Sequence, residues 1–209
     1  MSDVSSIGTP HGPVDVTTYG SDGPGVLLAH GAGAGQGHPW IVGLAERVAD
    51  RGVTVATFDY AYMAAGRKAP DRLPKLLDVH EAVAAWFSDT VGQFTLAGKS
   101  MGGRVGGHLV AERGVAATRL VYLGYPLVAL GKTEPRSTEH LTQIEVEQVF
   151  ISGERDRMGP LDLISAVAAS VPVGRVEVVA TGDHSLKPLK SSGSTLDESL
   201  DFAAGILAE

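Results

Sequence analysis

Short apolar runs alternate along this chain with longer segments in which apolar residues recur at helical spacing. Such alternation is typical of a parallel sheet, because each crossover between parallel strands needs a segment long enough for a helix. Most of the runs are almost continuously apolar, as expected of strands that are covered on both faces. The predicted strands are residues 13–19, 25–30, 53–60, 93–98, 119–124, 148–153 and 176–180. The sequence therefore predicts the α/β class.

Helical periodicity marks the segments that connect or follow these strands. We expect helices at about residues 39–51, 73–88, 101–113, 161–170 and 196–208. With 209 residues the chain has the size of one ordinary domain, so residues 1–209 are predicted to form a single domain. The longest irregular stretches are 61–72 and 125–146, the second with a short helix near 137–143. Neither is long enough for a folded lid, so we expect no cap domain.

The segment LAGKSMGG, residues 96–103, carries two motifs on the same letters. Gly98, Lys99 and Ser100 look like the end of a phosphate-binding P-loop, which requires another glycine five residues before Gly98. That position is Gln93, and the residues between are FTLA, a predicted strand rather than a glycine-rich turn. The P-loop interpretation therefore fails on both counts.

The same letters fit the G-x-S-x-G nucleophile elbow, in which a serine stands at the apex of a sharp turn between a strand and a helix. Gly98 and Gly102 flank Ser100 at the required spacing. Small residues are needed there because the strained turn leaves no room for side chains. Further glycines inside the following helix indicate that its backbone lies close to the sheet. Lys99 occupies the variable position of the motif, and nothing in the chemistry requires it.

A serine hydroxyl needs a general base, and that base needs an acceptor that fixes its tautomer. His184 follows the strand at 176–180, and Asp156 follows the strand at 148–153. Both lie at the carboxyl ends of strands, which is the edge where sheets of this class bind ligands. The chain order serine, acid, histidine is also one that known triads use. We therefore predict Ser100 as nucleophile, Asp156 as acid and His184 as base.

Other polar residues near these positions have alternative interpretations. Glu154 stays open as the triad acid because it lies two residues nearer its strand than the favoured aspartate. Asp183 precedes His184 and is expected to cap the turn. His30 and His38 flank a glycine-rich segment and are expected to orient it by hydrogen bonds rather than to catalyse.

Stabilising a tetrahedral intermediate requires two backbone N–H groups that face its negative oxygen. We predict one donor at Met101, directly after the serine, and the second at Gly31 or Ala32 in the glycine-rich segment 31–37. This segment does not fit the dinucleotide fingerprint G-x-G-x-x-G, because its third glycine is missing in both possible frames. No cofactor is therefore expected.

Composition restricts the classes of partner. The net charge of −7, with acids and bases interspersed, is expected to repel nucleic acid. The absence of cysteine excludes disulfides, thiolate metal sites and a cysteine nucleophile. No apolar run approaches the length of a membrane span and no export signal is recognisable, so we expect a cytoplasmic protein without a membrane partner. The sequence does not indicate an oligomeric state.

Several stretches resemble the α/β-hydrolases, specifically a compact lidless group similar to the dienelactone hydrolases. They are LAHGAGAG, FDYAYM, GRKAPDR, GKSMGGR, LGYPL, GERD and GDHSL, spread over residues 28–186. The resemblance implies a mostly parallel eight-stranded sheet, which we expect to be shortened to about seven strands because little chain precedes residues 25–30. It also implies Ser100, Asp156 and His184 in the roles assigned above. Dienelactone hydrolases use a cysteine nucleophile, which this chain lacks, so their lactone substrate is not carried over.

Two functions remain open at this point. The first is a carboxylesterase-like serine hydrolase that cleaves a small ester, thioester or amide through an acyl-enzyme on Ser100. Without a lid its pocket is expected to be shallow and exposed, with Tyr60, Tyr62 and Tyr125 as candidate lining residues. The second is a noncatalytic interaction module that keeps the same fold and binds partners through residues 125–146.

Overall fold

One eight-stranded sheet forms the centre of the computed structural model, which describes residues 2–20 and 23–209. The strand order is β1-β2-β4-β3-β5-β6-β7-β8. β1 and β2 run antiparallel to their neighbours, and the other six strands are parallel. The strands are β1 (Ser2–Ile7), β2 (Val14–Tyr19), β3 (Gly25–Ala29), β4 (Thr54–Phe58), β5 (Phe94–Lys99), β6 (Arg119–Leu123), β7 (Glu147–Gly153) and β8 (Gly174–Val179). The mostly parallel sheet predicted from the apolar runs is confirmed.

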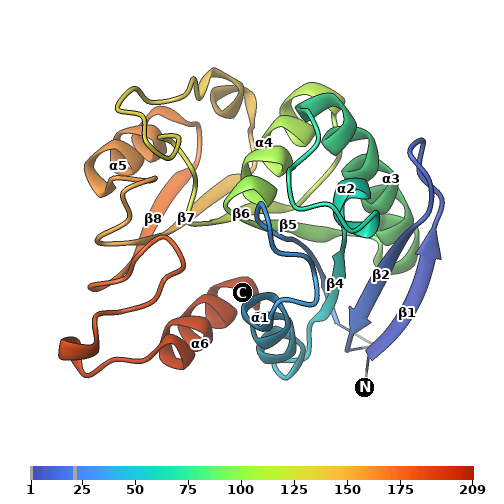
Figure 1. The fold of residues 1–209 in the computed structure, drawn as a ribbon, viewed down its shortest axis with the longest axis horizontal. Helices are drawn as coiled ribbons and strands as arrows, with labels where there is room; N and C mark the ends of the chain where they lie inside the picture. Colours follow the sequence, from blue (N-terminus) through green and yellow to red (C-terminus); the bar gives the residue numbers. More distant parts are fainter. Residues whose placement is uncertain (1, 21–22) are drawn as a thin grey trace.

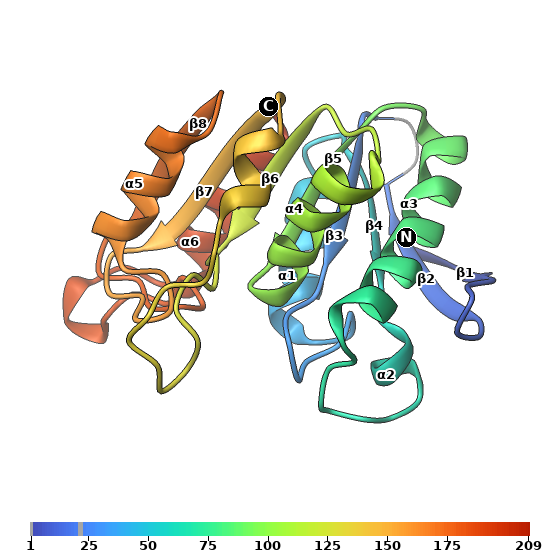
Figure 2. The ribbon, with the colours of Figure 1, turned by 90° about the horizontal axis from the view of Figure 1, so that it is seen from above.

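Helices cover both faces of this sheet and complete a three-layer α/β arrangement (Figure 1). The helices are α1 (Pro39–Ala49), α2 (Ala61–Ala64), α3 (Leu73–Val91), α4 (Met101–Arg113), α5 (Leu161–Ser170) and α6 (Leu196–Leu207), with 3-10 turns η1 (Glu139–Gln143) and η2 (Lys190–Ser192). α1 and α6 pack together on one face, and α3, α4 and α5 lie on the other (Figure 2). No helix in the described parts of the chain is long and apolar enough to cross a membrane.

The sheet contains one strand more than the seven apolar runs predict. This strand, β1, has the sequence SDVSSI and pairs only with β2 at the edge of the sheet. Its residues are mostly exposed, so no apolar pattern is needed to hold it in place. The short helix α2 was likewise expected to be irregular, because its four residues are too few for a helical period to be recognised.

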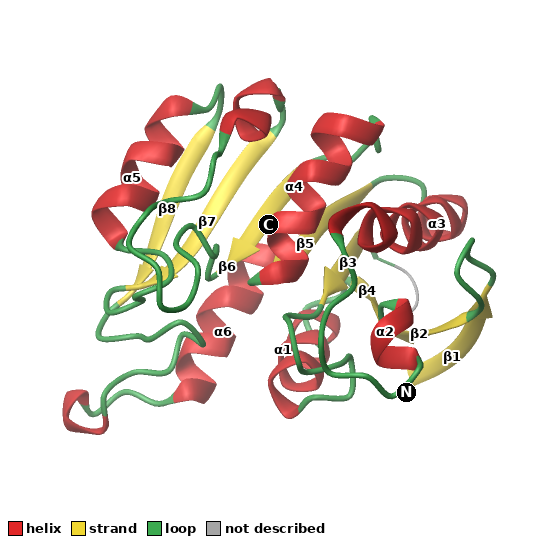
Figure 3. Ribbon diagram, turned by 45° about the horizontal axis from the view of Figure 1, so that its top comes forward, coloured by secondary structure: helices red, strands yellow, loops and turns green. Residues whose placement is uncertain are grey.

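The parallel strands direct their carboxyl ends to one edge of the sheet, and the loops that follow them gather there (Figure 3). β3 lies between β4 and β5, so its ends meet both neighbours directly. α4 can start close to this edge because it carries glycine where it crosses β3. A Cβ on Gly102 would lie only 2.6 Å from the carbonyl oxygen of Ala29. The turn after β5 thus lies beside the loop after β3, and the loops after β7 and β8 follow strands that end at the same edge.

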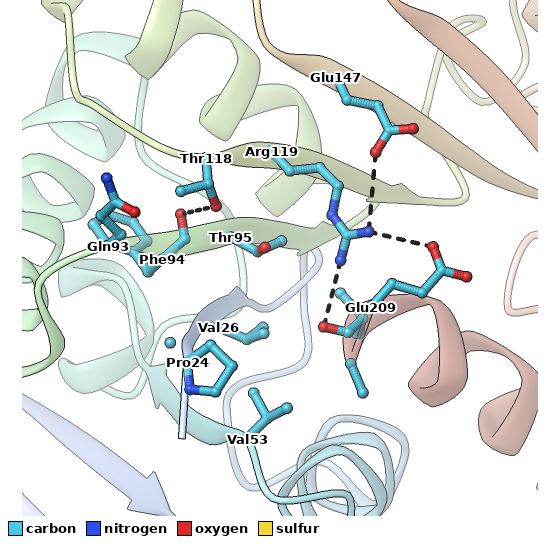
Figure 4. A pocket seen from close by; sticks show the side chains of 13 residues that line it. Pro24, Val26, Val53, Gln93, Phe94, Thr95, Thr118, Arg119, Glu147 and Glu209 are labelled. Carbon is cyan, nitrogen blue, oxygen red and sulfur yellow. Dashed lines mark hydrogen bonds and ion pairs between the residues drawn. The ribbon is translucent and has the colours of Figure 1, made fainter. Parts of the chain in front are cut away.

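Arg119 fastens the opposite, amino-terminal edge of the sheet to the end of α6 (Figure 4). Its guanidinium group donates to the backbone oxygen of Ile206 at 2.8 Å and pairs with Glu209 at 3.4 Å. A cavity of about 380 Å³ lies between these groups and the starts of β3 and β5. A cation at the carboxyl end of a helix is favourable because the last carbonyl groups lack helical partners. Arg119 therefore ties α6 to the sheet.

Candidate active site

Ser100 stands at the sharp turn between β5 and α4, as the elbow motif predicts. Its φ is +49°, a value that residues other than glycine rarely adopt. The flanking glycines are required by close approach, since a Cβ on Gly98 would collide with the backbone of Gly102 and Gly103. The turn lifts the serine side chain out of the strand and leaves it partly exposed at the carboxyl edge of the sheet.

The two other predicted residues lie next to this serine. Nε2 of His184 is 2.8 Å from Oγ of Ser100, and Nδ1 of His184 is 2.8 Å from Oδ2 of Asp156. A carboxylate only accepts hydrogen bonds, so Nδ1 carries the proton and Nε2 accepts from the serine hydroxyl. The loops after β5, β7 and β8 thus form one chain of hydrogen bonds across 84 sequence positions.

Asp156 is held as a buried carboxylate. Its side chain is 0 % exposed, and Oδ1 accepts the N–H of Met158 at 2.8 Å. Burial acts to raise the pKa of Asp156, but the hydrogen bond and charge of His184 and the N–H groups of Met158 and Gly159 outweigh it. The pKa of Asp156 therefore lies below its ordinary value, and the group is ionised at neutral pH.

The alternative acid, Glu154, points elsewhere. Its Oε2 accepts the N–H of Thr181 at 2.7 Å in an exposed position, so it fastens the turn after β8. Asp183 accepts the N–H groups of Ser185 and Lys187 at 2.8 and 3.1 Å. It caps the turn that carries His184, as expected from the sequence.

The glycine-rich loop after β3 is anchored by polar side chains. Buried His30 bonds the oxygen of Gly31 through Nδ1 at 2.7 Å and accepts the N–H of Tyr60 through Nε2 at 3.2 Å. Burial lowers the pKa of His30, which keeps it neutral for this pair of bonds. Asp59 accepts the N–H of Gln36 at 2.7 Å. These bonds hold the glycine-rich loop against the residues that follow β4. His30 therefore orients the loop, as expected from the sequence.

The predicted oxyanion donors lie beside the elbow. A Cβ on Gly31 would be 3.7 Å from Cβ of Ser100, and Gly31 and Ala32 line the same pocket as the serine. Met101 is the first residue of α4, so its N–H lacks a partner within the helix. The bond from the N–H of Arg104 to the oxygen of Ser100 is the first of this helix.

Lys99 has a role that the motif did not indicate. Its side chain is almost completely buried, and Nζ donates to the backbone oxygen of His184 at 2.5 Å. The same ammonium lies 5.6 Å from the ring centre of Trp40, whose Nε1 donates to the oxygen of Ser185 at 2.9 Å. Burial lowers the pKa of Lys99 to about 8, although Asp156 and Asp183 act against this shift. Lys99 and Trp40 together hold the histidine loop.

A pocket of about 800 Å³ opens at Ser100 and His184. Its walls come from the glycine loop, from α1 and α6, and from the loops after β6, β7 and β8. The lining residues are mostly apolar and include Trp40, Ile41, Leu130, Met158, Leu196 and Leu200. A volume of this size is in the range of sites that enclose small organic ligands. α1 and α6 supply part of the walls of this pocket, and its expected shallowness stays a prediction.

The three candidate lining tyrosines lie outside this pocket. Tyr60 and Tyr62 are 0 % exposed and Tyr125 is 1 % exposed, all in the core under α3, α4 and α5. Strand alternation places Tyr60 on the same face as Phe58, whereas the pocket opens on the face of α1 and α6. Tyr60 instead bonds His80 at 3.1 Å.

Residues 22–209 match the family described as Alpha/beta hydrolase domain. An α/β serine hydrolase without a lid from Xanthomonas campestris is similar with a TM-score of 0.73 and 16% identity, covering 99% of this chain and 91% of that one. Dienelactone hydrolase from Anabaena variabilis has a TM-score of 0.75 and 17% identity, covering 98% and 95%. The thioesterase domain from the curacin biosynthetic pathway has a TM-score of 0.78 and 14% identity, covering 100% of both chains. At these identities the likeness establishes a common fold.

Proposed function

This chain belongs to the alpha/beta hydrolase domain family, and on that premise we propose that it is a serine hydrolase. The reaction is cleavage of a carboxylic ester, thioester or amide through an acyl-enzyme on Ser100. The observation that carries the proposal is the hydrogen-bonded chain from Ser100 through His184 to buried Asp156, with both links 2.8 Å long. A nucleophile, a base and an orienting acid at these distances are the parts that such catalysis needs.

In the proposed mechanism, Nε2 of His184 takes the hydroxyl proton as Oγ of Ser100 attacks the carbonyl carbon. Asp156 keeps the imidazole in the required tautomer and stabilises the imidazolium that forms. The bond to the leaving group then breaks, and His184 gives the proton to that group. Water attacks the acyl-enzyme, passing one proton to His184, which returns it to Ser100 as the carboxylic acid leaves. The negative oxygen of each tetrahedral intermediate would face the N–H of Met101 and that of Gly31 or Ala32.

Labelling with a fluorophosphonate probe tests this proposal. Ser100 is expected to displace fluoride and form one stable adduct, since the probe reacts with serines that a base activates. Peptide mass spectrometry of the folded protein should locate the adduct on Ser100. Ser100→Ala, checked for folding by circular dichroism, should take up no label at the elbow. Folded wild-type protein that stays unlabelled would contradict the proposal and favour the noncatalytic interaction module.

The position of Lys99 leads to a second expected result. Lys99→Met is expected to lower kcat on p-nitrophenyl acetate by about 10- to 100-fold, with a smaller change in KM, because a misplaced base mainly impairs the chemical step.

The pKa of Lys99, about 8, also makes kcat depend on pH. Below pH 8 the ammonium is charged and strengthens its bond to the backbone oxygen of His184. Wild-type kcat should therefore fall as pH rises through about 8, and this fall should be absent in Lys99→Met.

Two controls separate positioning from general destabilisation. Lys99→Arg keeps a cation at every pH in this range and is expected to recover part of the lost kcat and to lack the fall near pH 8. Lys187→Met removes a lysine at the rim of the pocket and should leave the fall in kcat near pH 8 unchanged. If Lys99→Met retained both wild-type kcat and the wild-type pH profile, the assigned positioning role would be wrong.

A further inference from the structure

The pocket at Ser100 extends as an apolar groove between α1 and α6. We call it the α1/α6 groove and define it by Pro39, Trp40, Ile41, Gly43, Leu196 and Leu200. It is continuous with Ser100, since the same cavity of about 800 Å³ is lined by both. Apart from Trp40, which also holds the histidine loop, catalysis at the serine needs none of these side chains. Their apolar surface therefore indicates that they contact a part of the ligand that does not take part in the reaction.

The groove has a direction, and its apolar wall has a limited length. α1 starts at Pro39, directly after the glycine loop that borders Ser100, and leads away from it. From His38 to Arg47, both of which line the cavity, the helix rises by roughly 13 Å. At that distance Arg47 pairs with Asp197 at 2.6 Å, so the apolar wall ends at an ion pair. An extended apolar chain of limited length matches this shape.

The two sides of the reacting carbonyl differ in their surroundings. The leaving group departs beside Nε2 of His184, because that nitrogen protonates it. The groove begins beside both loops, since α1 continues directly from the glycine loop and its Trp40 donates to the oxygen of Ser185 in the histidine loop at 2.9 Å. The leaving group has to stay next to Nε2 of His184 to be protonated, so the acyl chain is the part of the substrate that can extend along α1.

We propose that the α1/α6 groove binds the apolar, medium-length acyl chain of an ester or thioester substrate. This inference rests on the proposed serine hydrolase function and names its substrate class. It extends the small acyl group expected from the sequence to a longer chain, because α1 and α6 provide an apolar wall beside Ser100. The ion pair of Arg47 with Asp197 sets the upper limit of chain length.

Gly43 lies in the wall of this groove. A Cβ at this position would lie 3.7 Å from Cδ1 of Leu200 and 3.1 Å from Nη1 of Arg47, so the missing side chain lets α6 and the Arg47 side chain approach α1. A phenylalanine there has to displace these groups or occupy the groove, and either change alters the shape of the groove. Gly205 offers a matched control, because it also lies within a helix, α6, but has open space around it and does not line the cavity.

Steady-state kinetics with p-nitrophenyl acetate, butyrate and octanoate test the proposal. Each methylene moved from water into the groove can raise kcat/KM by up to about fourfold, so octanoate should exceed acetate by at least about tenfold. Gly43→Phe should lower kcat/KM for octanoate by at least tenfold more than for acetate. Gly205→Phe, which adds the same side chain to a helix elsewhere, should keep the wild-type preference.

The outcomes distinguish this inference from the proposed function. A protein that takes the fluorophosphonate label and hydrolyses acetate but shows no rise from acetate to octanoate would overturn the groove assignment alone. The wild-type series gives this result even if Gly43→Phe fails to fold. Absence of both label and hydrolysis would instead remove the proposed function. If Gly43→Phe impaired octyl acetate, measured against ethyl octanoate by acid release, the groove would hold the alcohol and the acyl assignment would be overturned.

Discussion

Ser100→Ala is expected to lower kcat on p-nitrophenyl butyrate by about 10⁶-fold, because the triad acts as a unit and loses its covalent step without the hydroxyl. The hydroxyl of Ser100 is the one that Nε2 of His184 contacts, at 2.8 Å. The residual rate should come from substrate binding and the oxyanion donors, which do not depend on the serine side chain. The measurement is kcat under saturating substrate, compared with the uncatalysed rate in the same buffer.

The matched control for this substitution is Ser185→Ala, which removes a hydroxyl from the rim of the same pocket. Its backbone oxygen keeps the bond from Trp40, so activity should stay close to that of the wild type. The stability of Ser100→Ala should change little, because a φ of +49° is equally strained for serine and for alanine. A Ser100→Ala protein that retained more than about a thousandth of wild-type kcat would contradict a nucleophilic role for this residue.

The fold could be predicted from the sequence because the six parallel strands are nearly continuous apolar runs. Their positions are set by burial, and β3, β4, β5 and β6 are buried along their whole length. β1 escaped prediction for the opposite reason. Its hydrogen bonds to β2 form along the backbone, which leaves no trace in the alternation of side chains.

The three candidate catalytic residues could be predicted because each directly follows a strand of the parallel sheet. Strand ends in a parallel sheet share an edge, so a serine after β5, an aspartate after β7 and a histidine after β8 were expected to meet. The pocket could not be predicted in this way, because its walls depend on how α1 and α6 pack against each other. Strand alternation did hold a signal for Lys99, since Ala97 faces the core under α1 and α6 and Lys99 follows two residues later.

The same alternation explains why the aromatic residues after β4 were misplaced. Ala56, Phe58 and Tyr60 face the core under α3 and α4, and proximity to the strand end does not alter that side. Closeness in sequence to the catalytic edge therefore predicts whether a residue lines the pocket less well than the face of the sheet on which that residue lies. This distinction also separates the proposed apolar groove from the aromatic core behind the sheet.

Asp156→Asn is expected to lower kcat by about 10⁴-fold while leaving the shape of the site nearly unchanged. The amide oxygen can still accept the N–H of Met158, which is now bonded at 2.8 Å. The amide nitrogen, however, would donate to Nδ1 of His184 and place the proton of the imidazole on Nε2. That tautomer cannot accept the proton of Ser100, so the loss should appear in kcat and in the rate of fluorophosphonate labelling alike. Both are measurable on the same folded preparation.

Glu154→Gln is the control that decides between the two candidate acids. Because Glu154 bonds the N–H of Thr181 at an exposed position, its amide should keep kcat within about twofold of the wild type. Combining Asp156→Asn with Ser100→Ala should cost little more than Ser100→Ala alone, since residues of one catalytic unit are not additive. Equal losses in Glu154→Gln and Asp156→Asn would contradict the assignment. A loss confined to Asp156→Asn would tie the buried carboxylate, rather than its exposed neighbour, to the base that activates the serine.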